Sequence, residues 1–204
     1  MSNTVDDWER GRGRPSGVNR VAAAVLATPP RLGRVRLVAI DGPSGSGKST
    51  YAAELAAQIP DSRLVSTDEF ATWDDPIAWW PRLVAGVFHP LGAGRPGRYR
   101  RTQWVNGKPG PGDWVDVPVP GTLLVEGVSS GRRSIMSSLS ALIWCELPDP
   151  LRRLERAVAR DGADSRAELV RWQAFESGWY PVDRTRDRAS IVVLCDRSRT
   201  SSVR

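Results

Sequence analysis

A glycine-rich segment that ends in Lys48 and Ser49 has the residue types needed to bind the phosphates of a nucleotide. It fits the pattern Gly-x-x-x-x-Gly-Lys-Ser/Thr of the phosphate-binding P-loop. A turn that merely joins a strand to a helix has no need of Lys-Ser at this offset. The predicted nucleotide-binding residues are Gly42, Pro43, Ser44, Gly45, Ser46, Gly47, Lys48, Ser49 and Thr50.

The spacing of these residues indicates the chemistry. Glycines adopt backbone angles that other residues avoid, so the loop can curl around an anion. Its N–H groups and the N-terminus of a following helix then point at phosphate oxygens. Lys48 can place its ammonium on the β- and γ-phosphates, and the Ser49 hydroxyl can bind Mg²⁺. The segment therefore predicts a nucleoside triphosphate site, with ATP and Mg²⁺ as the expected cofactors.

Two acids follow short apolar runs and could assist phosphoryl transfer. Asp68 comes after the run 63–66, where it could accept the proton of a hydroxyl that attacks the γ-phosphate. A helix N-cap or loop acid is the alternative for Asp68. Glu126 follows the run 122–125, where an acid next to glycine is otherwise hard to explain in an apolar core. We therefore predict that Ser49 and Glu126 hold the metal ion.

An arginine-rich segment could close over the phosphoryl group. Arg153, Arg156 and Arg160 are spaced by three and four residues, so one helical face can present them together. In small phosphotransferases such a segment acts as a lid whose guanidinium groups stabilise the developing charge. A solvated face paired with nearby acids is the alternative. The group that we interpret as a lid consists of Arg152, Arg153, Arg156, Arg160 and Arg166.

Alternating strands and helices must position these residues. Short β-branched runs predict five buried strands, and Ala-, Leu- and Arg-rich segments predict the helices between them. This alternation is typical of an α/β fold with a five-stranded parallel sheet that is covered on both faces. Taken with the glycine loop, the arginine-rich segment and the hairpin, it predicts a P-loop NTPase three-layer sandwich with an Arg-bearing lid and a small hairpin insertion on the acceptor side. The predicted strands are 35–40, 63–66, 122–126, 141–147 and 191–195; the helices are 18–26, 51–59, 76–88, 150–160 and 164–177; the hairpin pairs 98–105 with 114–119 around 106–110.

The composition of the 204 residues suits one globular domain, predicted at 17–204, preceded by a loose polar tail at 1–16. The net charge of +6 favours a polyanionic ligand, but the basic residues are scattered among acids, which argues against nucleic acid as a partner. Cys145 and Cys195 end apolar runs and are interpreted as small core residues. Without a predicted membrane span or signal peptide, we expect a cytoplasmic protein with no membrane partner.

With these motifs the chain resembles the uridine kinase family of P-loop nucleoside kinases, in the phosphoribulokinase/uridine kinase group. The resemblance runs from about residue 34 to 193. It implies that Asp68 is the catalytic base, and that Asp74 holds sugar hydroxyls with the aromatic Trp73 beside it. Its specific parts are the P-loop, Ser66-Thr67-Asp68-Glu69-Phe70, Trp73-Asp74-Asp75-Pro76, Leu124-Val125-Glu126-Gly127, Arg160-Asp161 and Ala189-Ser190-Ile191-Val192-Val193.

The chain departs from the family on the hairpin. An aromatic-Asp-aromatic triplet is replaced by Thr102-Gln103-Trp104, and the histidine that follows it in nucleoside kinases is absent. The predicted catalytic residues are Asp68, Lys48, Arg156 and Arg160, and the predicted substrate-binding residues are Asp68, Trp73, Asp74, Trp104 and Arg166.

The expected function is ATP-dependent phosphorylation of a hydroxyl on a small molecule, with a uridine- or cytidine-like nucleoside as the first choice. An antibiotic, sugar or vitamin precursor is the alternative acceptor. If the protein is not an enzyme, the alternative is a non-catalytic regulator that binds ATP. The oligomeric state is left open, a homo-oligomer included.

Overall fold

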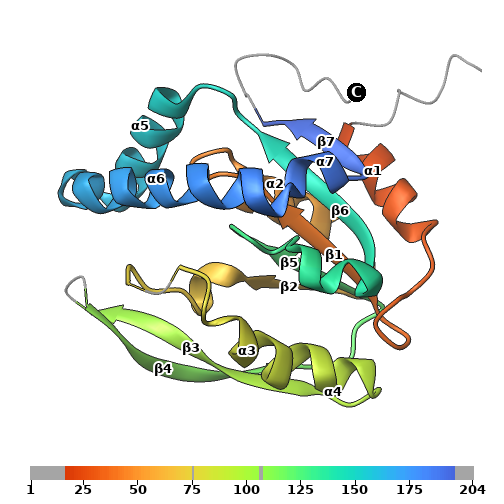
Figure 1. The fold of residues 1–204 in the computed structure, drawn as a ribbon. Helices are drawn as coiled ribbons and strands as arrows, with labels where there is room; N and C mark the ends of the chain where they lie inside the picture. The colour runs from red at the N-terminus through yellow and green to blue at the C-terminus, as the bar shows by residue number, and fades with distance from the viewer. Residues whose placement is uncertain (1–16, 75, 106–107, 196–204) are drawn as a thin grey trace, which may run out of the picture.

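A five-stranded parallel sheet forms the centre of the protein (Figure 1). The computed structural model describes residues 17–74, 76–105 and 108–195, so that the predicted tail at 1–16 lies outside the described residues. The strand order β2-β5-β1-β6-β7 confirms the predicted α/β fold and the parallel sheet. The strands are β1 (Arg36–Asp41), β2 (Ser62–Ser66), β5 (Thr122–Glu126), β6 (Leu139–Glu146) and β7 (Ile191–Leu194).

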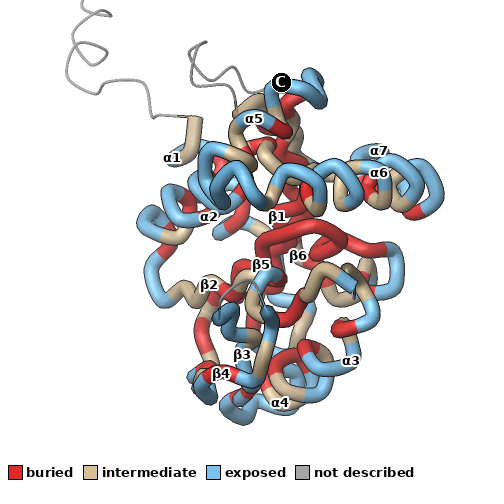
Figure 2. The backbone as a smooth tube through the Cα atoms, turned by 90° about the vertical axis from the view of Figure 1, so that its left-hand side faces the viewer, coloured by how far each residue is buried: buried red, intermediate tan, exposed pale blue. Residues whose placement is uncertain are grey.

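Two apolar cores cover the two faces of this sheet, because successive strand residues point to opposite sides. Leu37 and Ala39 of β1 belong to one core, and Val38 and Ile40 to the other. Figure 2 shows the buried backbone concentrated along β1, β5 and β6. One core is closed by α1 (Gly17–Leu26) and α2 (Lys48–Ala56), and the other by α3 (Trp80–Leu83), the π-helical turn η2 (Val84–Phe88), α4 (His89–Gly92) and η3 (Arg133–Ser138).

The helix predicted at 76–88 begins and ends four residues later in the structure, where α3, η2 and α4 follow one another from Trp80 to Gly92. It begins late because the chain turns at Pro76, whose carbonyl accepts a hydrogen bond of 2.8 Å from the Trp79 indole N–H. The π-helical turn lies where its backbone closely approaches that of Arg98. A Cβ added to Gly86 would lie 2.7 Å from the Arg98 carbonyl oxygen.

The predicted hairpin is present as a separate two-stranded antiparallel sheet of β3 (Gly97–Val105) and β4 (Lys108–Val117). The strand expected at 114–119 begins six residues earlier, at Lys108. Pro109 and Pro111 indicated a loop from the sequence, but they pair with Trp104 and Thr102. A two-stranded sheet consists of edge strands, which tolerate proline. Of the predicted turn at 106–110, residues 106 and 107 lie outside the described residues.

The segment after β6 forms α5 (Pro150–Asp161), η4 (Ala163–Ser165), α6 (Arg166–Asp183) and α7 (Thr185–Arg188). Figure 1 shows α5 and α6 toward the β7 edge of the sheet and the hairpin beyond the β2 edge. α6 continues six residues past its predicted end at 177, through Gly178 and Pro181. Tertiary contacts hold this extension, because the Tyr180 hydroxyl donates to Asp41 at 2.9 Å. Among the described helices, none has the length and apolar character that crossing a bilayer requires.

Candidate active site

The glycine loop is held in one conformation by close backbone contacts. Gly42, Gly45 and Gly47 have φ angles of 150°, 75° and 98°, a region that side-chain-bearing residues avoid. A Cβ at Gly42 would lie 2.3 Å from the Cys145 carbonyl oxygen, and one at Gly45 would lie 2.1 Å from that of Arg153. The loop is therefore clamped between the end of β6 and the start of α5, and larger residues would displace it.

Two polar side chains of this loop have no bonding partner among the described residues. The Lys48 side chain belongs to a residue only 7% exposed, yet no carboxylate in the described ranges forms an ion pair with it. The buried Ser46 hydroxyl likewise has no hydrogen-bond partner among the described residues. Buried charges are normally paired. A loop with an unpaired ammonium at the N-terminus of α2 thus has the chemistry to receive an anion such as a phosphate.

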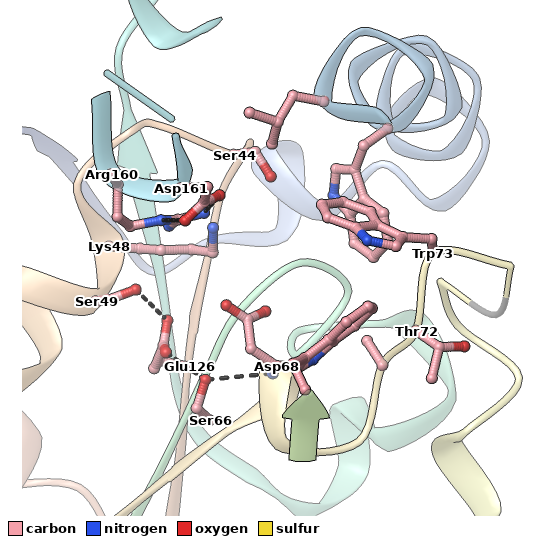
Figure 3. Close-up of a pocket in the computed structure, with 14 residues that line it drawn as sticks. Ser44, Lys48, Ser49, Ser66, Asp68, Thr72, Trp73, Glu126, Arg160 and Asp161 are labelled. Atoms are coloured by element: carbon pink, nitrogen blue, oxygen red, sulfur yellow. Dashed lines mark hydrogen bonds and ion pairs between the residues drawn. The ribbon is translucent and has the colours of Figure 1, made fainter. Parts of the chain in front are cut away.

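Glu126 at the end of β5 lies beside the loop and accepts two hydrogen bonds. Ser49 Oγ donates to Oε2 at 3.1 Å, and Ser66 Oγ donates to Oε1 at 2.6 Å (Figure 3). Burial raises the pKa of the Glu126 carboxyl, while the Lys48 ammonium and the two serine hydroxyls lower it and the negative charge of Asp68 raises it.

The Ser49–Glu126 pair has the donor set that Mg²⁺ prefers. Both offer oxygen atoms, and Mg²⁺ is usually bound by one or two protein groups together with substrate phosphates and water. No group of three His, Cys, Asp or Glu side chains that could hold an ion by itself occurs within the described part of the chain. The residues present therefore fit a metal that arrives with a nucleotide.

Asp68 lies in η1 (Thr67–Glu69), the short 3₁₀ turn that follows β2. Its backbone N–H donates to Ser66 Oγ at 3.3 Å, so the same serine contacts both Glu126 and the turn that carries Asp68. The Asp68 residue is exposed, and Figure 3 shows its carboxylate pointing into the cavity. The turn after β2 thus presents an ionisable oxygen opposite the glycine loop.

These groups surround one cavity of about 630 Å³. It brings together residues of the loop, the β2 and β5 ends, the hairpin, α5 and α6, and eight of the predicted site residues are among them. The lining consists of Ser44, Lys48, Ser49, Ser66, Asp68, Ala71, Thr72, Trp73, Trp104, Glu126, Arg160, Asp161, Leu169 and Trp172.

Three of the predicted catalytic and substrate-binding residues do not line the cavity. The Arg156 guanidinium donates to the Cys195 carbonyl at 3.3 Å, beside Gly47. Arg166 forms an exposed ion pair of 2.6 Å with Glu155. Asp74 is exposed and accepts a hydrogen bond of 2.8 Å from the Thr72 hydroxyl. Of the lid arginines predicted for the site, Arg160 reaches the cavity, where its guanidinium pairs with Asp161 at 2.6 Å, and Arg156 and Arg166 do not.

One face of α6 contacts the site, and this contact was not predicted from the sequence. Trp172 lines the cavity. Four residues later, Glu176 Oε1 accepts the Ser44 backbone N–H at 2.9 Å, and four residues after that Tyr180 donates to Asp41. Burial raises the pKa of Glu176, and the Lys48 charge lowers it. The spacing of four was visible in the sequence, but nothing in it indicated that this face meets the P-loop.

Asp41, at the end of β1, gives a pH prediction. It is fully buried and accepts hydrogen bonds from the N–H groups of Gly42, Ser129 and Gly131 and from Tyr180. Burial raises its pKa from the ordinary 3.8 to about 6, although the Gly131 and Gly42 N–H groups oppose this. The folded state therefore retains a proton that the unfolded chain releases, and this stabilisation is complete below about pH 4 and lost as the pH rises through about 6.

We expect the free energy of unfolding of the wild type, relative to Asp41→Asn, to fall by up to about 3 kcal/mol between about pH 4 and pH 7. Urea denaturation of both proteins across this range measures the difference, because other carboxyls titrate equally in the two. A difference that stays constant or increases with pH would contradict the raised pKa.

These features are those of a P-loop NTPase fold. A glycine loop joins β1 to α2, and an acid ends the adjacent strand β5. Solved structures agree with this class. A possible uridine kinase from Bacillus stearothermophilus superposes with a TM-score of 0.60 and 16% identity, over 86% of this chain and 96% of that one. A protein from Silicibacter sp. TM1040, provisionally assigned as a fructose transport system kinase, gives 0.50 and 20%, over 80% and 95%.

At such identities the likeness establishes the fold, and the resemblance inferred from the motifs is confirmed at that level. No protein-family model matches the chain, and no curated protein matches it in sequence.

Proposed function

We propose that the protein is an ATP- and Mg²⁺-dependent phosphotransferase that moves the γ-phosphate to a hydroxyl group of a small molecule. The observation that carries this proposal is the single cavity in which Lys48, the Ser49–Glu126 pair and Asp68 lie around the same space. The cavity has an anion-binding loop on one side and a carboxylate on the other. Phosphoryl transfer requires both, because the nucleotide and the acceptor hydroxyl must be held next to each other.

In this mechanism the chain mainly positions and stabilises charge. The loop N–H groups and Lys48 would hold the phosphates, and Ser49 and Glu126 would hold the metal ion. When bound there, Mg²⁺ would supply Lewis-acid stabilisation of the phosphate oxygens. Asp68 orients the acceptor hydroxyl and takes its proton. The hydroxyl oxygen forms the new bond to the γ-phosphorus while the bond to the bridging oxygen breaks, and ADP leaves.

The lid contributes through Arg160. Its guanidinium lies at the cavity and is paired with Asp161, so it can stabilise charge on the transferring group if that pair opens. Arg156 and Arg166 are kept as proposed lid residues that would have to move to reach the phosphoryl group, because their guanidiniums bond elsewhere.

A nucleoside is the acceptor that the motif resemblance supports, and a sugar is the alternative. The name of one similar structure mentions uridine and that of the other fructose. Both acceptors carry hydroxyls, so the coarser proposal of a small-molecule kinase holds for either.

Calorimetric titration of the protein with ATP in the presence of magnesium tests the proposal. We expect binding with a dissociation constant between about 1 μM and 1 mM, in the usual range for enzyme substrates. Chelation of magnesium with EDTA should weaken the binding, because Ser49 and Glu126 lose the ion that links them to the phosphates. Absence of binding at several millimolar ATP, with the protein folded by circular dichroism, would overturn the proposed function.

A further inference from the structure

The cavity is polar at one end and aromatic at the other. Lys48, Ser49 and Glu126 gather at the polar end, and Trp73 lies at the opposite end (Figure 3). Trp104 and Trp172 join Trp73 there. A molecule that fills the cavity therefore places its reacting hydroxyl among polar groups and the rest of its body against indole rings.

The three rings come from three separate elements, namely the loop after η1, β3 and α6. The ring centroids of Trp73 and Trp104 are 5.5 Å apart with an interplanar angle of 62°, and those of Trp73 and Trp172 are 6.0 Å apart at 83°. Neither pair is stacked face to face, so the rings keep surface that a ligand can contact. Trp104 is 39% exposed, which leaves apolar area for a ligand to cover. Flat aromatic groups are the ligands that such surfaces favour.

The groups that a sugar would need are engaged elsewhere. Sugar hydroxyls require several hydrogen-bonding side chains at the wall of the site. Asp74, to which the resemblance assigns this role, is exposed, bonds to Thr72 and does not line the cavity. The Glu69 carboxylate accepts the Tyr99 hydroxyl and does not line it either.

The acids at the polar end have partners as well, with one exception. Glu126 accepts hydrogen bonds from two serine hydroxyls, and Asp161 is bound by both ends of the Arg160 guanidinium. Asp68 is the remaining carboxylate of the lining, and among the described residues none donates a hydrogen bond to its side-chain oxygens. One carboxylate can orient one hydroxyl.

We infer that the acceptor is an aromatic alcohol with a single reacting hydroxyl. Its flat ring system is recognised by Trp73, Trp104 and Trp172, and recognition does not depend on sugar hydroxyls. The inference rests on the proposed function and narrows its acceptor. In the transfer, the alcohol oxygen bonds to the γ-phosphorus, its proton passes to Asp68, and ADP leaves with the electrons of the broken bond. The product is an aryl-alkyl phosphate monoester.

Three compounds separate the acceptor classes: 2-naphthalenemethanol carries a ring and one hydroxyl, uridine a ring and a sugar, and D-ribose a sugar alone. Calorimetry measures binding of each to the protein without nucleotide, and phosphorus NMR measures transfer from ATP. We expect 2-naphthalenemethanol to bind at least about tenfold more tightly than uridine and to be phosphorylated, and ribose not to bind. Preference for uridine or ribose would overturn the inference.

Tryptophan variants test the recognition of the ring. Trp172→Ala and Trp104→Ala should each weaken binding of 2-naphthalenemethanol by about tenfold, in the range of one aromatic contact. Trp114→Ala is the matched control, since Trp114 is 56% exposed on β4, lies against the Arg98 guanidinium and does not line the cavity. Unchanged affinity in the first two variants, or an equal loss in all three, would contradict the inference.

ATP titration of the same proteins distinguishes the two proposals. ATP binding by the wild type together with no binding of 2-naphthalenemethanol would overturn this inference and leave the proposed function standing. Absence of ATP binding would overturn both. Retained ATP binding in Trp172→Ala and Trp104→Ala shows that these variants fold, so that a lost aromatic ligand reports on the ring site.

Discussion

Asp68→Asn is expected to lower turnover by about 10²–10⁴-fold and to leave ATP affinity nearly unchanged. The amide has the size of the carboxylate but cannot accept the proton of the attacking hydroxyl. ATP affinity should persist because the loop, Lys48 and Glu126 are untouched. Loss of the negative charge also removes an influence that raises the pKa of Glu126, so metal binding should not suffer. Single-turnover transfer and ATP calorimetry measure the two effects separately.

Asp74→Asn provides the matched control for this prediction. Asp74 lies six residues along the same segment, and its carboxylate accepts a hydrogen bond from Thr72 but does not line the cavity. We expect turnover of this variant to stay within about twofold of the wild type, as for most surface substitutions. A large loss in Asp74→Asn with little loss in Asp68→Asn would exchange their roles and favour a sugar-binding acceptor site.

The phosphate loop and the central sheet could be predicted because their signals are local. The Gly-Lys-Ser spacing is a constraint on a few consecutive residues, and a buried parallel strand appears as a continuous apolar run. The boundaries that failed depend on distant partners. α6 passes Gly178 and Pro181 because Tyr180 reaches Asp41, 139 residues away in sequence, and this contact cannot be inferred from the composition of the helix.

For the site as well, residues marked by a local sequence signal were predicted correctly, and residues whose position depends on the fold were not. Asp68 and Glu126 were found because both follow strands whose carboxyl ends meet at one edge of the sheet. The arginines of α5 share a helical face, but Arg153 and Arg160 are about 10 Å apart along its axis at the usual helical rise. That face therefore runs from the outside of the glycine loop, at Arg153 and Arg156, to the cavity, at Arg160.

Lys48→Met is expected to remove ATP binding without unfolding the protein. The ammonium lowers the pKa of Asp41, Glu126 and Glu176, so all three carboxyls lie within its electrostatic reach. Without it, their negative charge is unopposed beside the loop and repels a triphosphate. The fold should tolerate the change because the side chains are similar in length and no ion pair is broken among the described residues.

Thermal unfolding with and without ATP and magnesium measures this effect. At a ligand concentration of about 100 times the dissociation constant, the wild type should gain about 2.7 kcal/mol, and Lys48→Met should gain nothing. Lys108→Met is the matched control, because Lys108 is the other lysine of the chain and is exposed at the start of β4. Equal stabilisation of Lys48→Met and Lys108→Met by ATP would place the phosphates away from the glycine loop. The assignments of Ser49, Glu126 and Asp68, which depend on a triphosphate at that loop, would then be lost as well.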